Sequence, residues 1–324
     1  MSTGFPGRAA RERRRAMSAK ITAVARANEV SDRHDWATRG DGYCPWLSRG
    51  SNRPPRRANL HTIRQVRQEP SVRPAAVAGM FYPADPRTLK QAVTDALNSV
   101  PDNVPAARCV VAPHAGYIYS GQIAAHSFAA LKKTGIDFEL IAILGPNHRV
   151  PYRGMCTPGA DYMETPLGAV KTVHPEDFPT DPYVHELEHC IEVELPFVQV
   201  LFPNATVLPL VVAEPDELKV AAVIETVLHN PKAAVVISSD MSHFLPPDES
   251  VRMDVATIDA VADYKPIDGF QACGYMSWNG LTHYAQEHSL IPTLMTRDHS
   301  HSGNSVVGYT SFAYLESPST QEGE

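Results

Sequence analysis

The sequence predicts an α/β fold with a mostly parallel central sheet flanked by helices. From residue 72 onward, short apolar segments of strand length alternate with helix-like segments of about 12–16 residues. The strand-like segments are apolar throughout, as expected for parallel strands that are buried on both faces. The chain has 324 residues, of which 43% are hydrophobic and 20% charged, a composition typical of globular domains.

The first expected elements run from an entry strand to a long helix and back into the sheet. "VRPAAVAGMFYPADP" predicts an entry strand and turn over 72–86, and apolar residues at helical spacing predict a helix over 86–100. "RCVVAP" predicts a buried strand over 108–113. "GQIAAHSFAALKK" then predicts a helix over 121–133.

The later elements continue the same alternation. "LIAILGP" predicts a strand over 140–146, and "CIEVELPFVQVLF" predicts a helix over 190–202 that Pro196 interrupts. The remaining expected elements are a strand over 206–212, a helix over 215–230, a strand over 232–240, a helix over 250–264 and a final strand over 305–316.

Charge divides the chain into two parts. Residues 1–70 hold 15 Lys and Arg against 6 Asp and Glu, a net charge of +9, whereas the remainder has a net charge of −16. We therefore expect a basic, disordered extension over 1–70, an α/β domain over 71–318 and a disordered tail over 319–324. An arm that binds nucleic acid and an organellar transit segment are alternatives for the extension. No aromatic interleaving supports the nucleic-acid alternative.

Cysteine content and the absence of targeting signals indicate a cytoplasmic protein. The five cysteines are widely spaced and include no CxxC pair, which argues against a disulfide framework. The start of the chain lacks the pattern of a signal peptide, and no apolar run approaches the roughly 20 residues of a membrane-spanning helix. We expect neither a membrane nor nucleic acid as a partner.

Three of the expected strands end at a histidine. His114 follows "RCVVAP", His148 follows "LIAILGPN", and His243 follows "AVVISSDMS" with Asp240 three residues earlier. Ligands bind beyond the carboxyl ends of the strands in such sheets, so these side chains are expected at one edge. His114 and His148 are 34 residues apart, about one strand–helix–strand crossover, which predicts that they follow adjacent strands.

These residue types suit either a metal site or acid–base catalysis. Glu188 and His189, expected at the start of a helix, add a carboxylate and a further imidazole. Two histidines and one anionic ligand leave coordination positions open, as in non-haem iron sites. Without a metal, His243 with Asp240 nearby would serve as an acid–base pair. The sequence has no GxSxG motif and no GxxxxGK[ST] motif, which removes support for hydrolase and P-loop functions.

A set of ordered motifs resembles the Memo family, which occurs in prokaryotes as the Memo-like component, protein B, of the AmmeMemoRadiSam system. The resemblance covers residues 72 to 316 and implies a fold like that of the class III extradiol dioxygenases. The basic extension has no counterpart in the family pattern. The motifs, in chain order, are "AVAGMFYP", "APHAGYIYSG", "GPNH", "EHCIEVELPF" and "SSDMSHF".

The resemblance also implies the metal ligands. His114 in "APHAGY" and His148 in "GPNH" match the family's two metal-binding histidines. Cys273 in "FQACGYMSWNGL" matches the third ligand, although the residues after Cys-Gly, including Trp278, depart from the family form. A thiolate at this position suits copper or zinc as well as iron, which is the expected ion.

The resemblance further implies the catalytic residues. His243 matches the histidine that acts as acid or base in the related dioxygenases, and Asp240 lies beside it in sequence. Glu188 and His189 match the family's "EHS" stretch, in which Cys190 replaces the serine.

Three functions stay open on the sequence alone. The first is a metal-dependent oxidoreductase that works with a radical SAM enzyme and AMMECR1-like proteins, as the family name implies. The second is a non-enzymatic adaptor that binds a peptide, a protein or a small molecule in the inherited pocket. The third is extradiol cleavage of a catechol, which Cys273 disfavours because the dioxygenases use a carboxylate there.

Overall fold

The computed structural model describes residues 69–176, 178–300 and 304–317. The basic extension predicted over 1–70 lies outside these residues except for its last two, and so does the tail predicted over 319–324. Every helix in the described ranges is too short or too polar to span a membrane.

The described elements alternate between strands and helices through most of the domain. In chain order they are β1 (Val72–Arg73), α2 (Pro86–Asn98), β2 (Cys109–Ala112), α3 (Tyr117–Lys133), β3 (Leu140–Pro146), β4 (Gly154–Cys156), β5 (Tyr162–Thr165), β6 (Gly168–Lys171), α4 (Pro182–Glu186), η1 (Glu192–Glu194), α5 (Leu195–Leu201), β7 (Thr206–Ala213), α6 (Glu217–Leu228), β8 (Ala233–Ser238), β9 (His243–Leu245), α7 (Pro247–Ala262), α8 (Tyr275–His288), β10 (Leu290–His299) and β11 (Val306–Glu316).

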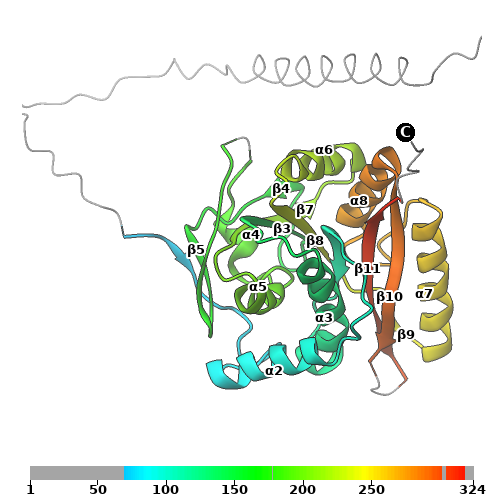
Figure 1. Cartoon of the computed structure of the whole chain (residues 1–324), viewed down its shortest axis with the longest axis horizontal. Helices are drawn as coiled ribbons and strands as arrows, with labels where there is room; N and C mark the ends of the chain where they lie inside the picture. The colour runs from blue at the N-terminus through cyan, green and yellow to red at the C-terminus, as the bar shows by residue number, and fades with distance from the viewer. Residues whose placement is uncertain (1–68, 177, 301–303, 318–324) are drawn as a thin grey trace, which may run out of the picture. The chain divides into compact units, whose positions relative to one another are not determined.

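The main sheet has the strand order β10-β11-β2-β8-β3-β7-β4, with β9 paired to β11 (Figure 1). Within it, parallel pairing between neighbouring strands is limited to β2, β8, β3 and β7. The prediction of a mostly parallel sheet is therefore wrong, because the sheet is mixed. β10 and β11 form a hairpin, whose strands must run antiparallel, and β11 also joins β2 in the antiparallel sense. β4 closes the other edge antiparallel to β7.

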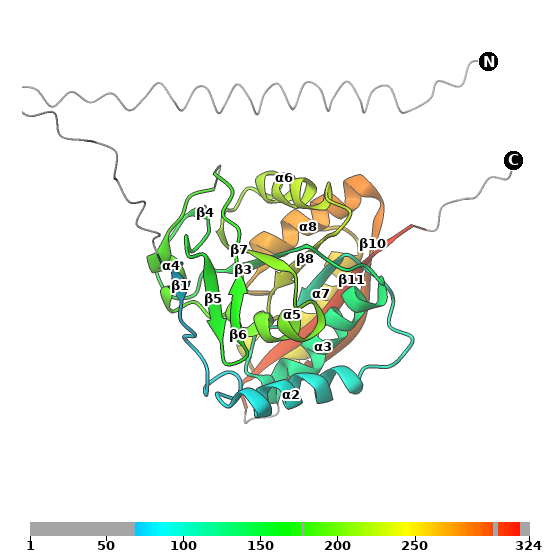
Figure 2. The same cartoon turned by 60° about the vertical axis from the view of Figure 1, so that its left-hand side comes forward.

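A second, three-stranded sheet precedes the segment that carries Glu188. Its order is β1-β5-β6, with β5 and β6 forming an antiparallel hairpin beside β1 (Figure 2). The sequence patterns predict no element between 147 and 187. Short strands in this segment give little periodic signal, because each has only three or four residues.

Helices cover both faces of the main sheet. α2, α3 and α5 lie on one face, and α6, α7 and α8 lie on the other (Figure 1). Val110 of β2 packs in the core that contains Phe128, whereas its neighbour Val111 packs in the core that contains Trp278. Alternate residues of one strand thus enter two cores, which explains why the central strands are apolar at every position.

The predicted helix over 190–202 begins later than expected. Residues 190 and 191 precede the short 3₁₀ segment η1, and the α-helical part starts at Leu195. Pro196 therefore lies in the first turn of α5, where its missing N–H leaves no intrahelical hydrogen bond unmade. The turn before η1 is consequently free to present Glu188 and His189 at the sheet edge.

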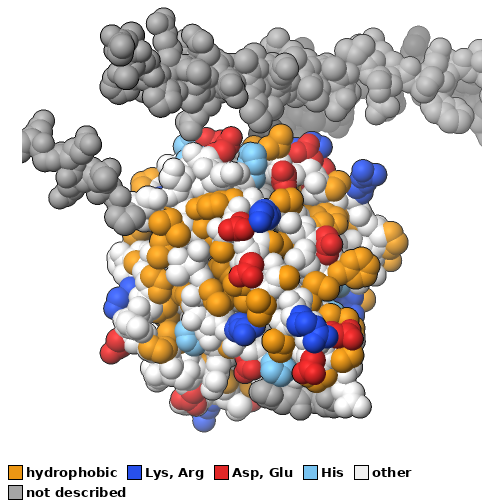
Figure 3. Space-filling model, turned by 90° about the vertical axis from the view of Figure 1, so that its right-hand side faces the viewer, with side chains coloured by type: hydrophobic (Ala, Val, Ile, Leu, Met, Phe, Trp, Pro, Cys, Tyr) orange, Lys and Arg blue, Asp and Glu red, His pale blue; other side chains and the backbone are white. Residues whose placement is uncertain are grey.

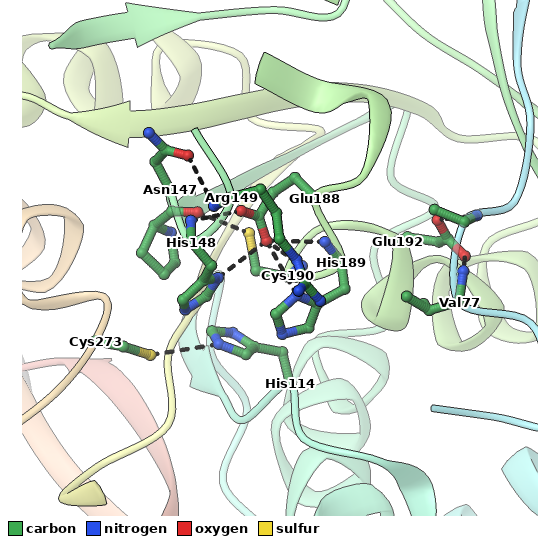
Figure 4. A network of polar contacts seen from close by, with 12 residues as sticks. Val77, His114, Asn147, His148, Arg149, Glu188, His189, Cys190, Glu192 and Cys273 are labelled. Atoms are coloured by element: carbon green, nitrogen blue, oxygen red, sulfur yellow. Dashed lines mark hydrogen bonds and ion pairs between the residues drawn. The ribbon is translucent and has the colours of Figure 1, made fainter. Parts of the chain in front are cut away.

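A buried ion pair fastens the entry segment to this turn. The guanidinium of Arg73 donates to the carboxylate of Glu192, to the carbonyl of Glu188 at 2.6 Å and to that of His185 at 3.0 Å. Glu192 also accepts the backbone N–H of Val77 at 3.0 Å, a contact that Figure 4 shows. Both charged side chains are almost fully buried, and each has several hydrogen-bond partners, as buried charges require.

The outer surface near α7 has a mixed character. Figure 3 shows hydrophobic, acidic and basic side chains interspersed across the face that α7 occupies. Val251 and Val255 of this helix are partly exposed, whereas Val261 is buried in the core that contains Trp278. Scattered apolar side chains of this kind are ordinary on a solvent-facing surface.

The contact between α6 and α8 depends on a glycine. A Cβ atom on Gly280 would lie 2.4 Å from Cγ1 of Val220. We expect Gly280→Ala to lower the free energy of unfolding by about 1–3 kcal/mol, because overpacking outweighs the better helix propensity of alanine. Gly121→Ala in α3 is the matched control, since its Cβ meets only ordinary contacts, the nearest at 3.4 Å. Urea denaturation of both variants measures the difference, and equal stabilities would contradict the close α6–α8 approach.

Candidate metal centre

The structure brings His114 and His148 together at one edge of the main sheet. His114 follows β2 and His148 follows β3, but β8 lies between these two strands. The prediction that the two histidines follow adjacent strands is therefore wrong. Their ring centroids are nevertheless 5.1 Å apart, and Figure 4 shows the two rings side by side.

Cys273 joins the two histidines from a loop before α8. Its Sγ lies 3.3 Å from Nε2 of His114, and the potential ligand atoms of His114, His148 and Cys273 all lie within 4.8 Å of one another. The next residue, Gly274, donates its N–H to Oγ of Ser239 at 2.9 Å. A Cβ on Gly274 would lie 2.6 Å from Cβ of Ser239, so only glycine lets this loop approach closely enough to present the thiol.

His114 has a defined tautomer. Its Nδ1 lies 2.7 Å from Oγ of Ser238, which in turn donates to the carbonyl of Cys190 at 2.7 Å. The hydroxyl therefore accepts the Nδ1–H of His114 and leaves the Nε2 lone pair directed at the thiol. Burial lowers the pKa of His114 well below 6.5, and the neighbouring charge of His148 lowers it further. The ring is thus neutral, which is the form that binds metals.

Glu188 orients His148 in a similar way. Its Oε2 accepts the backbone N–H of His148 at 2.6 Å, and its Oε1 lies 2.9 Å from Nδ1 of the same residue. Burial by itself raises the pKa of Glu188, but the hydrogen bonds and charge of His148 outweigh it and hold the pKa well below its usual range. An anionic carboxylate on Nδ1 leaves Nε2 free, an arrangement common behind metal-binding histidines.

His189 lies beside these residues and outside the group of three. Its ring stacks on that of His148 with centroids 4.8 Å apart, and packs against Phe81 at 4.5 Å. Its backbone N–H donates to Oε1 of Glu188 at 2.8 Å. Its Nδ1 is buried and has no hydrogen-bond partner among the described residues, although it lies 3.2 Å from the same Oε1.

Asp240 and His243 complete the polar cluster. Oδ1 of Asp240 accepts the backbone N–H of His114 at 2.8 Å, so the carboxylate holds the loop that carries this ligand. Burial raises the pKa of Asp240 to about 6, although the charge of His243 opposes the shift. His243 begins β9 and pairs with Val307 of β11. The next residue, Phe244, has a left-handed φ of 57° and exposes 75% of its surface.

Two polar residues behind His114, Ser238 and Glu194, were not predicted as part of the site. Ser238 ends β8 two residues before Asp240, so its position at a strand end was a usable signal. Glu194 lies in η1, fully buried, with Oε1 3.1 Å from Oγ of Ser238 and with Oε2 lacking a partner among the described residues. Burial raises the pKa of Glu194 well above 4.5, which keeps the carboxyl neutral. No periodic pattern marked this glutamate as buried.

The donor set fits a soft or borderline metal ion. Two imidazoles, whose Nδ1 atoms are held by Ser238 and Glu188, and one thiol converge within 4.8 Å. Nitrogen and sulfur donors of this kind suit iron, copper and zinc, and they do not suit magnesium or calcium, which prefer oxygen.

The neutral state of Glu194 predicts a pH-dependent stability. The folded chain retains a proton that the unfolded chain releases above about pH 4.3, so this residue lowers stability as the pH rises, by up to about 1.4 kcal/mol per pH unit. Glu194→Gln keeps a neutral side chain of the same shape. We expect its gain in unfolding free energy over wild type to grow above about pH 4.3 and to vanish below it. Urea denaturation across this range, with exposed Glu164→Gln as control, measures the effect. A pH-independent difference would contradict a buried neutral carboxyl.

Comparison with known proteins places the chain in a family. Residues 73–311 match the model of a family described as Memo-like protein. A MEMO1 family protein of Archaeoglobus fulgidus is 33% identical over 263 residues, covering 74% of this chain and 97% of the relative. Another, of Sulfolobus acidocaldarius, is 33% identical over 282 residues, covering 75% of this chain and 99% of the relative. The chain therefore belongs to the Memo-like protein family.

Proposed function

We propose that this chain is a metal-dependent redox protein that holds one ion, with iron favoured over copper or zinc, through His114, His148 and Cys273. The observation that carries the proposal is the convergence of two Nδ1-anchored imidazoles and one thiol at a sheet edge. Three protein ligands would leave coordination positions open, and the bound ion would supply electron transfer to a substrate or to oxygen. The position of this proposed metal site at the strand ends supports a class III extradiol dioxygenase-like fold.

The surrounding residues have distinct tasks in this proposal. His243 holds or moves a proton beside the ion, a role that imidazole side chains commonly have in catalysis. Asp240 positions the His114 loop through the 2.8 Å hydrogen bond to its backbone. Glu188 and His189 orient His148 through the hydrogen bond and the ring stacking. The Memo-like resemblance supports a radical SAM enzyme and AMMECR1-like proteins as partners.

A second candidate function is a peptide-binding adaptor. A groove of about 680 Å³ runs beside the start of α3, which follows the His114 loop directly. Tyr117, Ile118 and Tyr119 line it, together with Asp95 of α2 and the end of β10. An aromatic and acidic groove of this size suits a peptide segment better than a small diatomic substrate.

Metal content tests the first proposal. We expect iron-reconstituted wild type, prepared anaerobically under reducing conditions, to contain at least one ion per chain. His114→Ala and Cys273→Ser should each lower the content by one equivalent, because two ligands hold such an ion poorly. His229→Ala, which removes an exposed histidine after α6, is the control and should change nothing. Elemental analysis measures the ratio. No bound iron, copper or zinc in wild type would reject the redox proposal and favour the adaptor.

The role of His243 is separable from ion binding. We expect His243→Asn to keep the wild-type ion content and to reduce oxygen consumption by the iron-loaded protein with a reductant by about 10²–10⁴-fold, the usual contribution of an acid–base group. An oxygen electrode measures the rate. Unchanged consumption would remove His243 from the proposed chemistry, and a ring-cleaved product from added catechol would instead favour the dioxygenase alternative.

A further inference from the structure

A second group of potential metal ligands lies directly behind the first. Atoms of His148, Glu188 and Cys190 all lie within 4.8 Å of one another. Cys190 is fully buried, and its Sγ lies 3.1 Å from the carbonyl oxygen of Pro146. The proposed redox site does not use this thiol. Cys190 is thus a buried nucleophilic group, close to a carboxylate and an imidazole, without an assigned role.

We propose that the chain binds a second divalent metal ion of the zinc type through Nδ1 of His148, the carboxylate of Glu188 and Sγ of Cys190. This site goes beyond the proposed redox function, since the two share only His148. One nitrogen, one oxygen and one sulfur donor match the ligands that zinc takes in proteins.

One pair of donors is slightly closer together than it would be around a bound ion. Nδ1 of His148 lies 2.9 Å from Oε1 of Glu188, whereas ligand atoms around a tetrahedral zinc ion lie about 3.3–3.8 Å apart, given bonds of about 2.0–2.3 Å. A small outward movement of either side chain would admit the ion between them. It would take the place of the proton that the two groups now share.

His189 borders this group of three without belonging to it. Its Nδ1 lies 3.2 Å from Oε1 of Glu188, at ion-pair distance, and its backbone N–H donates to the same oxygen at 2.8 Å. The side chain is therefore a polar neighbour of the proposed ion and not one of its ligands.

The backbone of β3 makes room for the thiol. A Cβ atom on Gly145 would lie 2.4 Å from Sγ of Cys190, so any larger residue there would displace the sulfur. The backbone at Gly145 and Pro146 therefore packs closely against Cys190. The side chain of His148 is 25% exposed and gives an ion a route in from solvent.

Ion uptake at this site releases protons in a defined balance. Sγ of Cys190 donates its proton to the carbonyl of Pro146 at 3.1 Å, so the ion-free side chain is a thiol and ion binding would release that proton to solvent. With both sites filled, His148 would bind one ion through Nε2 and the other through Nδ1, and its Nδ1 proton would also leave. The incoming double positive charge offsets the negative charges of Glu188 and the new thiolate.

Counting ions in single-ligand variants tests the second site. We expect anaerobic titration of reduced protein with Cd²⁺ or Co²⁺ to reach two ions per chain in wild type. Cys190→Ser and Cys190→Ala should each bind one, Cys273→Ser should bind the other one, and His148→Ala should bind none. Cys156→Ser, which changes another buried cysteine, is the matched control and should bind two. The thiolate-to-cobalt charge-transfer absorption should fall to about half of the wild-type value in each Cys190 variant. It should likewise fall to about half in the separate variant Cys273→Ser.

The pattern of losses separates this inference from the redox proposal. One ion in wild type with no further loss in either Cys190 variant would overturn the second site and leave the first intact. Loss of one ion in the Cys190 variants but none in Cys273→Ser would support the second site and reject the first. Circular dichroism and thermal melting of each variant ensure that a lost ion reflects a lost ligand and not an unfolded chain.

Discussion

Burying the carboxylate of Glu188 is costly unless its lone pairs find donors, and the polar end of the domain is arranged around that requirement. His148 supplies two donors, from its backbone and its ring, and the backbones of His189 and Cys190 supply two more. Each donor belongs to a segment that carries a candidate functional side chain. One satisfied carboxylate therefore fixes the turn after β3 relative to the turn before η1.

The ion pair of Arg73 and Glu192 extends this constraint to the entry segment. Arg73 donates to the carbonyl of Glu188 itself, so the turn that holds the site is tied to β1 and to the backbone that follows it. The entry segment also places Phe81 against the ring of His189. Residues more than 100 positions apart in the chain thus support one another through buried charge.

Sequence patterns predicted the parts of this arrangement that local rules control. Apolar runs at β2, β3 and β8 marked strands buried on both faces, and His114 and His148 followed from strand ends. Strand order is a tertiary property, so neither the insertion of β8 between β2 and β3 nor the antiparallel β10–β11 hairpin could be read locally. The partly exposed β10 and the glycine-containing α8 lack a clean period and were missed, as was Glu194, whose burial depends on packing.

The position of β8 between the two histidine-bearing strands has a consequence for how tightly a ligand can be held. Strands two places apart are separated by about 9.5 Å, a spacing that the hydrogen-bonded sheet enforces. The two imidazoles thus project from rigid backbone, and folding has already restricted their conformational freedom. Little ordering entropy is left to lose on association, so affinity at this edge reflects donor chemistry more than loop flexibility.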